Sequence, residues 1–127
     1  MNLRVPVVAV AALLATTHLA NAEDAAFGNP SGCAAFREDW DNSSDLMLLV
    51  RPGEISHWES ACVLPDAPFD GREIAATCSG EGEDWTIKVS LTVPETRPEV
   101  MIYVEFDEET GRPLRTDELW RCQGRGP

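Results

Sequence analysis

The chain has 127 residues and a formal net charge of −12, from 22 acidic and 10 basic side chains. A polyanion of this kind repels nucleic acid and anionic membrane surfaces, so we expect neither as a partner. The length allows one core, while a hydrophobic fraction of 43% is too high for a disordered acidic tail. The composition therefore predicts one small acidic globular domain.

The N-terminal segment has the pattern of a cleavable secretory signal peptide. A short apolar stretch follows Arg4, and residues 20–22 form the Ala-Asn-Ala pattern of a cleavage site. The apolar stretch is shorter than the roughly 20 residues needed to span a bilayer. We therefore predict a signal peptide over 1–22 and a single disulfide-linked β domain over 23–127. That domain is expected to be periplasmic or secreted, with no membrane insertion once the signal is removed.

Beyond the signal peptide, the sequence predicts one short helix followed by strands. Ser31 can cap a helix over 33–38, where alanines favour helix but the segment is too short for more than about two turns. Apolar residues then recur with a period of two, interrupted by turn residues. Asp70-Gly71 is the strongest turn signal in the chain. The expected strands lie at 46–50, at 55–64, around 74–78, at 85–93, at 100–106 and near 114–122.

Two of these segments alternate most clearly between apolar and polar residues. Over 85–93 the odd-numbered positions are apolar, and over 100–106 the even-numbered positions, from Val100 to Phe106, are the expected inward face. Alternation of this kind is typical of antiparallel strands with one buried face. The fold class predicted is all-β: a small antiparallel meander of five to six strands, arranged as a sandwich or partly closed barrel, with a short N-terminal helix and two disulfides.

Four cysteines, all in the exported part, predict two disulfides, because export leads to an oxidising compartment. Their spacing contains no C-x-x-C pair and no clustered histidine, so we expect no metal site and no cofactor. Alternation places Cys62 and Cys78 on facing sides of a hairpin, so these two can bond. That leaves Cys33 and Cys122 to tie the ends of the domain together. The runner-up pairing joins Cys33 to Cys62 and Cys78 to Cys122. Either pairing is expected to place three tryptophans near sulfur and in the core: Trp58, Trp85 and Trp120.

Acidic residues concentrate in two clusters at expected hairpin tips. Residues 23–111 hold 5 basic and 20 acidic side chains, a balance of −15, whereas 112–127 hold four basic and two acidic ones. In a meander, the turns after the third and fifth strands lie at the same end of the sheet. The candidate binding residues are the two clusters and the lone exported histidine: Glu81, Glu83, Asp84, Asp107, Glu108, Glu109 and His57. An acidic surface attracts basic proteins, so the expected function is a non-catalytic exported binding protein that engages or inhibits a basic partner protein.

His57 also supports two other hypotheses. As the single histidine outside the signal peptide it is the one usual general base, but no G-x-S-x-G segment accompanies it. A hydrolase is therefore the least favoured function, and no catalytic residue is assigned. A small-ligand or glycan-binding barrel is the second hypothesis, with Trp40, His57 and neighbouring apolar groups forming its mouth.

In size, signal sequence, acidity and disulfide-linked β pattern, the chain is similar to small bacterial periplasmic inhibitors of lysozymes and proteases. That resemblance implies a β fold and binding to an enzyme partner. The chain departs from the lysozyme-inhibitor families at their Ser-Gly-x-x-Tyr loop. Here Ser31-Gly32 is followed by Cys33 and two alanines, and the lone tyrosine, Tyr103, lies in a predicted strand.

Overall fold

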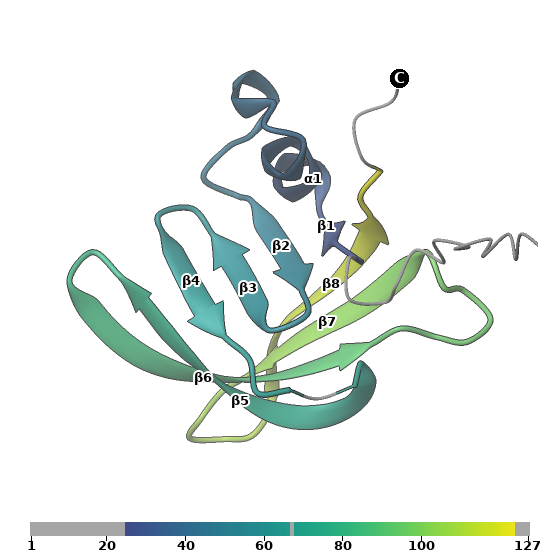
Figure 1. Cartoon of the computed structure of the whole chain (residues 1–127). Coiled ribbons are helices and arrows are strands. Elements are labelled where there is room, and N and C mark those ends of the chain that lie inside the picture. Colours follow the sequence, from purple (N-terminus) through teal and green to yellow (C-terminus); the bar gives the residue numbers. More distant parts are fainter. Residues whose placement is uncertain (1–24, 67, 124–127) are drawn as a thin grey trace, which may run out of the picture.

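The computed structural model of the chain describes residues 25–66 and 68–123, and the predicted signal peptide over 1–22 lies outside them. Within these residues, eight antiparallel strands follow one another in sequence order around a closed barrel, with one short helix outside it (Figure 1). The strands are β1 (Phe27–Gly28), β2 (Leu48–Arg51), β3 (Glu54–His57), β4 (Ser60–Val63), β5 (Asp70–Gly80), β6 (Glu83–Thr92), β7 (Val100–Phe106) and β8 (Pro113–Arg121). The helix is α1 (Pro30–Phe36), and a 3-10 turn, η2 (Trp40–Asn42), follows it. The expected all-β fold with a short N-terminal helix is confirmed.

The barrel is closed by its shortest strand. β1 has two residues, yet it pairs antiparallel with both β2 and β8, and Phe27 lies opposite Val50 on one side and Arg121 on the other. A two-residue strand carries no alternation, so the sequence did not indicate it. The expected sandwich or partly closed barrel is therefore corrected to a closed barrel.

A tight turn divides the strand expected over 55–64 into β3 and β4. The two strands pair antiparallel around Trp58-Glu59, and Glu59 adopts a positive φ of 59°. Turns of this kind usually contain glycine or asparagine, so a Trp-Glu pair carries no turn signal. Together with β1, this division raises the strand count from the expected five or six to eight.

The Asp70-Gly71 pair opens a strand where a turn was expected. It begins β5 with a bulge, and the pairing with β6 shifts register between Asp70 and Glu73. Gly71 has a φ of 88°, and its carbonyl oxygen accepts a hydrogen bond of 2.8 Å from the Ser90 hydroxyl. The positive φ that glycine tolerates is therefore used to form a bulge at this position, and not the expected turn.

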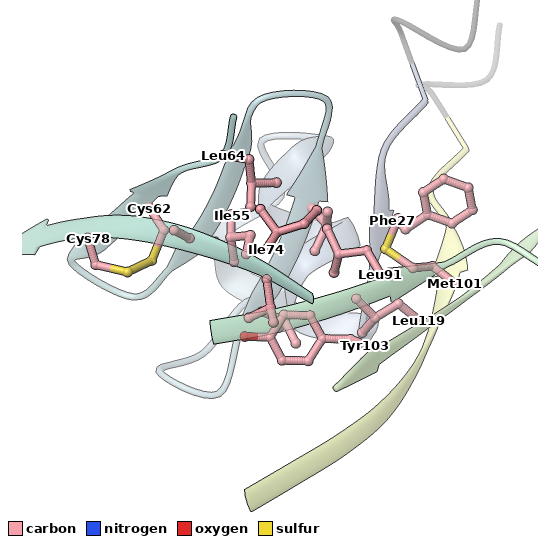
Figure 2. Close-up of a cluster of buried hydrophobic side chains, with 14 of the residues drawn as sticks. Phe27, Ile55, Cys62, Leu64, Ile74, Cys78, Leu91, Met101, Tyr103 and Leu119 are labelled. Atoms are coloured by element: carbon pink, nitrogen blue, oxygen red, sulfur yellow. A yellow bond between two sulfur atoms is a disulfide. The ribbon is translucent and has the colours of Figure 1, made fainter. Parts of the chain in front are cut away.

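The interior of the barrel holds the main hydrophobic core (Figure 2). In β2, Leu48 and Val50 point inward and are fully buried, whereas Leu49 between them packs on the outside with α1. Each large side chain buried in this way stabilises the fold by roughly 1.5–3 kcal/mol. The largest fully buried side chains of this core include Tyr103, Leu48, Ile55, Leu91, Met101 and Leu119.

The alternation expected in β6 is confirmed, whereas that in β7 is reversed. Val89 and Leu91 of β6 lie in the core and Ile87 packs against it, whereas Trp85, near the start of the strand, is exposed. In β7 the inward residues are Met101 and Tyr103, both fully buried, while Ile102 is only partly buried. Both faces of this strand are apolar, and a shift of one residue exchanges them, so alternation alone does not choose between them. The observed register places Glu105 on the inward face as well.

Helix α1 is capped by Asn29 and lies directly on β2. The Asn29 Oδ1 atom accepts hydrogen bonds from the backbone N–H of Gly32, at 2.7 Å, and of Leu48, at 3.1 Å. Asn29 Nδ2 donates to the Leu46 carbonyl at 2.7 Å. Asn29, and not the expected Ser31, therefore caps the helix and also ties it to the strand. A Cβ atom at Gly32 would lie 2.1 Å from the Leu48 carbonyl oxygen, so the two backbones are in direct contact.

Both disulfides follow the first-choice pairing. Cys62 and Cys78 are direct cross-strand partners in β4 and β5 and lie in the core. Cys33 in α1 is bonded to Cys122, with 5.1 Å between their Cα atoms, and joins a second hydrophobic cluster that includes Leu49. Two disulfides are typical of an oxidising, extracellular environment. No helix among the described residues is long and apolar enough to cross a membrane.

Candidate functional site

An open pocket of about 700 Å³ lies on the outer face of the barrel, between α1 and the β3–β4 turn. Its floor is a row of outward-facing residues paired across four neighbouring strands: Leu49, Ser56, Ala61 and Ser79. Apart from Leu49 these side chains are small, so the floor is recessed between larger groups. The pocket therefore follows from the register of β2 to β5 and from the size of the residues in one row.

Two walls rise from this floor. α1 and the segment after it contribute Phe36, Trp40 and Met47, and the β3–β4 turn contributes Trp58 and Glu59. Figure 1 shows α1 and the β3–β4 hairpin on either side of the N-terminal end of β2. Trp40 is 59% exposed and Trp58 is 43% exposed, although both line the same pocket. Large exposed apolar side chains gathered beside polar groups are typical of binding sites.

These exposures contradict the expectation that three tryptophans pack in the core. Trp58, Trp85 and Trp120 are 43%, 39% and 50% exposed. Trp58 lies in a turn, Trp85 lies near the β5–β6 tip, and Trp120 faces outward on β8 beside the inward-facing Leu119. The core is filled instead by aliphatic side chains, Phe27 and Tyr103. Tryptophan in this protein is therefore a surface residue.

The pocket also presents hydroxyl and carboxylate oxygens. The Ser56 hydroxyl donates a hydrogen bond of 2.8 Å to Glu54, and Arg51 Nη2 lies 3.8 Å from the same carboxylate. Among the described residues, the Ser79 hydroxyl has no hydrogen-bond partner and Glu59 forms no ion pair. Ser79 and Glu59 are therefore available to a ligand.

A second group of polar side chains lies on the inward faces of β7 and β8. The Tyr103 hydroxyl donates to Glu105 Oε2 at 3.1 Å, and the Arg115 guanidinium lies 5.9 Å from the centroid of the Tyr103 ring. Arg115 Nε also donates to the Asp117 carboxylate. The β7–β8 register assembles the group, because it pairs Tyr103 with Asp117 and Glu105 with Arg115. The polar groups of these residues find their hydrogen-bond and charge partners within the cluster, as is typical of polar residues with a structural role.

His57, a candidate from the sequence, lies between the pocket and this inner group. It borders the pocket at the end of β3 and pairs with Leu48, whose side chain points into the barrel. Burial lowers the pKa of His57 below its ordinary value of 6.5, while the charge of Glu105 raises this pKa and that of Arg115 lowers it. The imidazole is therefore mainly neutral at pH 7.

The lowered pKa of His57 predicts a pH-dependent stability. The unfolded chain takes up this proton at a higher pH than the folded chain, so the free energy of unfolding falls as the pH drops below about 6.5. Chemical denaturation at pH 7 and pH 5 is expected to show a smaller fall for His57→Gln than for the unmodified chain. Hydrogen bonds also lower the pKa of Asp70 and of Asp107 below the ordinary value of 3.8. These two carboxyl groups therefore change stability at lower pH, outside the range from pH 7 to pH 5. Equal falls in the two proteins would contradict the prediction.

The two acidic clusters expected from the sequence lie at separate hairpin tips. Glu81 occupies the β5–β6 turn with a φ of 50°, and Glu83 begins β6. Asp107 accepts hydrogen bonds from the backbone N–H groups of Glu109, at 2.8 Å, and Thr110, at 3.0 Å. These hydrogen bonds lower the pKa of Asp107, and the bond from Thr110 has the larger effect. The Asp107 carboxylate therefore shapes its own turn.

Both acidic tips and His57 lie at the same end of the barrel, but they do not form a single site. The β3–β4, β5–β6 and β7–β8 turns share that end because consecutive strands are antiparallel. Figure 1 shows the β5–β6 and β7–β8 tips apart from each other. Across residues 25–66 and 68–123, no group of three or more histidine, cysteine or carboxylate side chains is placed to hold a metal ion.

Sequence reasoning named only part of the pocket. Trp40 and His57, suggested as the mouth of a ligand site, both line it. Trp58 and the small floor residues were missed, because the pocket depends on a turn without turn residues and on the register of four strands. The functional assignment rests on this geometry, since no known protein family, curated protein or solved structure matches the chain.

Proposed function

We propose that this protein is an exported, non-catalytic binding protein that holds a small ligand or a glycan unit in the pocket between α1 and the β3–β4 turn. The observation that carries the proposal is that two strongly exposed tryptophans from separate elements, Trp40 and Trp58, line one open pocket. Apolar surface left in water costs roughly 25 cal/mol per Å², so a ligand that covers these rings gains affinity.

The dimensions and chemistry of the pocket support this proposal. Its volume of about 700 Å³ falls within the range of ligand sites, roughly 300–1,000 Å³. The face of an aromatic ring carries partial negative charge and attracts the C–H groups of a sugar or an alkylamine. The oxygens of Ser79 and Glu59 can accept hydrogen bonds from ligand O–H or N–H groups. The two disulfides and the predicted signal peptide support a periplasmic or secreted location.

Binding of a basic partner protein at the acidic hairpin tips is the second candidate function. The exposed carboxylates of Glu81, Glu83 and Glu108 favour it, because none forms an ion pair within the described part of the chain. It ranks second because the tips are separate and because surface charge raises association rates more than affinity. A hydrolase is not proposed, since no hydrogen bond among the described residues joins His57 to a serine or a carboxylate.

Replacing Trp58 with alanine is expected to weaken ligand binding at least about tenfold, because a central tryptophan of a binding site commonly contributes about 2 kcal/mol. Saturation-transfer NMR against a panel of sugars and alkylamines would identify a ligand, and calorimetry would give its affinity for each variant. Trp58 is exposed in a turn, so its replacement should change the free energy of unfolding by only about 0.5 kcal/mol.

Trp120→Ala is the matched control for this experiment. Trp120 is 50% exposed and lies under the Arg97 guanidinium, 5.8 Å from the ring centroid, outside the pocket. The proposed function predicts that Trp120→Ala keeps the affinity of the unmodified chain. Equal losses in the two variants, or an absence of binding by every compound in the panel, would refute it.

A further inference from the structure

The side chains that line the pocket narrow the class of ligand. Three aromatic residues from three different elements, Phe36, Trp40 and Trp58, share the lining with the carboxylate of Glu59. Aromatic ring faces and carboxylates attract the same kind of group, a cation. Their combination in one pocket is more specific than either feature alone.

The charge balance of the pocket points in the same direction. Arg51 is the one arginine or lysine that lines it among the described residues, and its guanidinium lies 3.8 Å from the Glu54 carboxylate. Its positive charge is therefore already partly balanced by a neighbour. Glu59 projects from the exposed β3–β4 turn, and the whole chain carries −12. An anionic ligand would meet a field of the wrong sign, whereas a cationic ligand would be attracted.

We infer that the ligand carries an alkylated ammonium group, which the aromatic side chains and Glu59 bind together. This inference rests on the proposed function, since it takes the pocket as the ligand site. A quaternary ammonium spreads its charge over methyl groups and donates no hydrogen bond, so it leaves water at a lower cost than a primary ammonium. Ring faces attract such a cation, and a nearby carboxylate adds to the attraction. A neutral ligand would use the rings but gain little from the carboxylate.

Choline and 3,3-dimethyl-1-butanol test the inference, because they share size and shape and differ in having N⁺ or carbon at the branched centre. Their dissociation constants for the unmodified chain would be measured by NMR titration at pH 7 and low salt. We expect choline to bind about tenfold more tightly than the neutral alcohol. Equal binding of the two probes, or no binding of choline, would overturn the inference.

Glu59→Gln, with Glu83→Gln as its matched control, tests the role of the carboxylate. Both substitutions remove one charge at the same end of the barrel, but only Glu59 lines the pocket. Glu59→Gln should weaken choline binding about threefold and leave the alcohol unchanged, while Glu83→Gln should change neither. Equal weakening by the two substitutions would refute a local role of Glu59.

The two levels of the proposal can fail separately. If the neutral alcohol binds as well as choline and Trp58→Ala weakens both, the ammonium inference fails and the proposed function stands. If neither probe nor any compound of the panel binds, both fail.

Discussion

Replacing Cys33 and Cys122 with alanine is expected to lower the free energy of unfolding by about 4.5 kcal/mol. The bond joins residues 89 positions apart, and the loss of unfolded-chain entropy grows with the logarithm of the loop length. The same relation gives about 3 kcal/mol for the Cys62–Cys78 bond, which spans 16 positions. Because small domains are stable by only about 5–15 kcal/mol, either loss is a large part of the total.

Urea denaturation of the two double variants would measure this difference. The variant without the Cys33–Cys122 bond should be the less stable by about 1.5 kcal/mol. It should also lose more ligand binding, because Cys33 anchors α1, which forms a wall of the pocket. A variant without the long-range bond that is as stable as the one without the short-range bond would contradict this account.

Replacing Gly32 with alanine is expected to cost about 3 kcal/mol, because overpacking at a closed contact forces the backbone to move. The added Cβ would lie 2.1 Å from the Leu48 carbonyl oxygen and 2.7 Å from its carbonyl carbon. These are backbone atoms of β2, so no side-chain rotation can relieve the contact. Displacing α1 would also strain the Asn29 cap and shift the pocket wall that carries Phe36.

Gly82→Ala separates this steric effect from the general cost of replacing glycine. Gly82 has a φ of 78° in the β5–β6 turn, and a Cβ there would meet no atom within 4 Å. Its replacement should cost only about 1–2 kcal/mol, from the left-handed backbone. Thermal or urea unfolding of both variants gives the comparison. If Gly32→Ala is as stable as Gly82→Ala, then α1 does not lie directly on β2.

The sequence was most informative where one physical constraint acts alone. In β6 one face is apolar and the other polar, so alternation fixed which residues point into the barrel. The Cys62–Cys78 bond followed from the same period of two, because both residues lie on inward faces of adjacent strands. Once that pair was assigned, Cys33 and Cys122 remained to bond with each other.

The remaining features depend on tertiary contacts that single-sequence patterns do not contain. β7 is apolar on both faces, so only its pairing with β6 and β8 places Tyr103 inward and Ile102 outward. The Trp58-Glu59 turn has no turn residues, and its position decides that Trp58 lies beside the pocket. The pocket floor requires the register of four strands, and its wall requires the contact of Gly32 with β2. The residue types along each of these segments do not by themselves predict the β7 register, the position of the turn or the pocket.

The most direct test of the binding pocket is a titration of the ¹⁵N-labelled chain with choline, observed at the four tryptophan indole N–H resonances. Trp40 and Trp58 line the pocket, whereas Trp85 and Trp120 are exposed elsewhere on the molecule. The account predicts that the resonances of Trp40 and Trp58 shift with a common dissociation constant while the other two remain in place. Shifts confined to Trp85 and to the backbone amides around Glu83 would contradict the assignment of the pocket as the ligand site. An absence of shifts at every indole would overturn the ammonium inference, and the pocket assignment would fail with it if no compound of the panel shifted these resonances either.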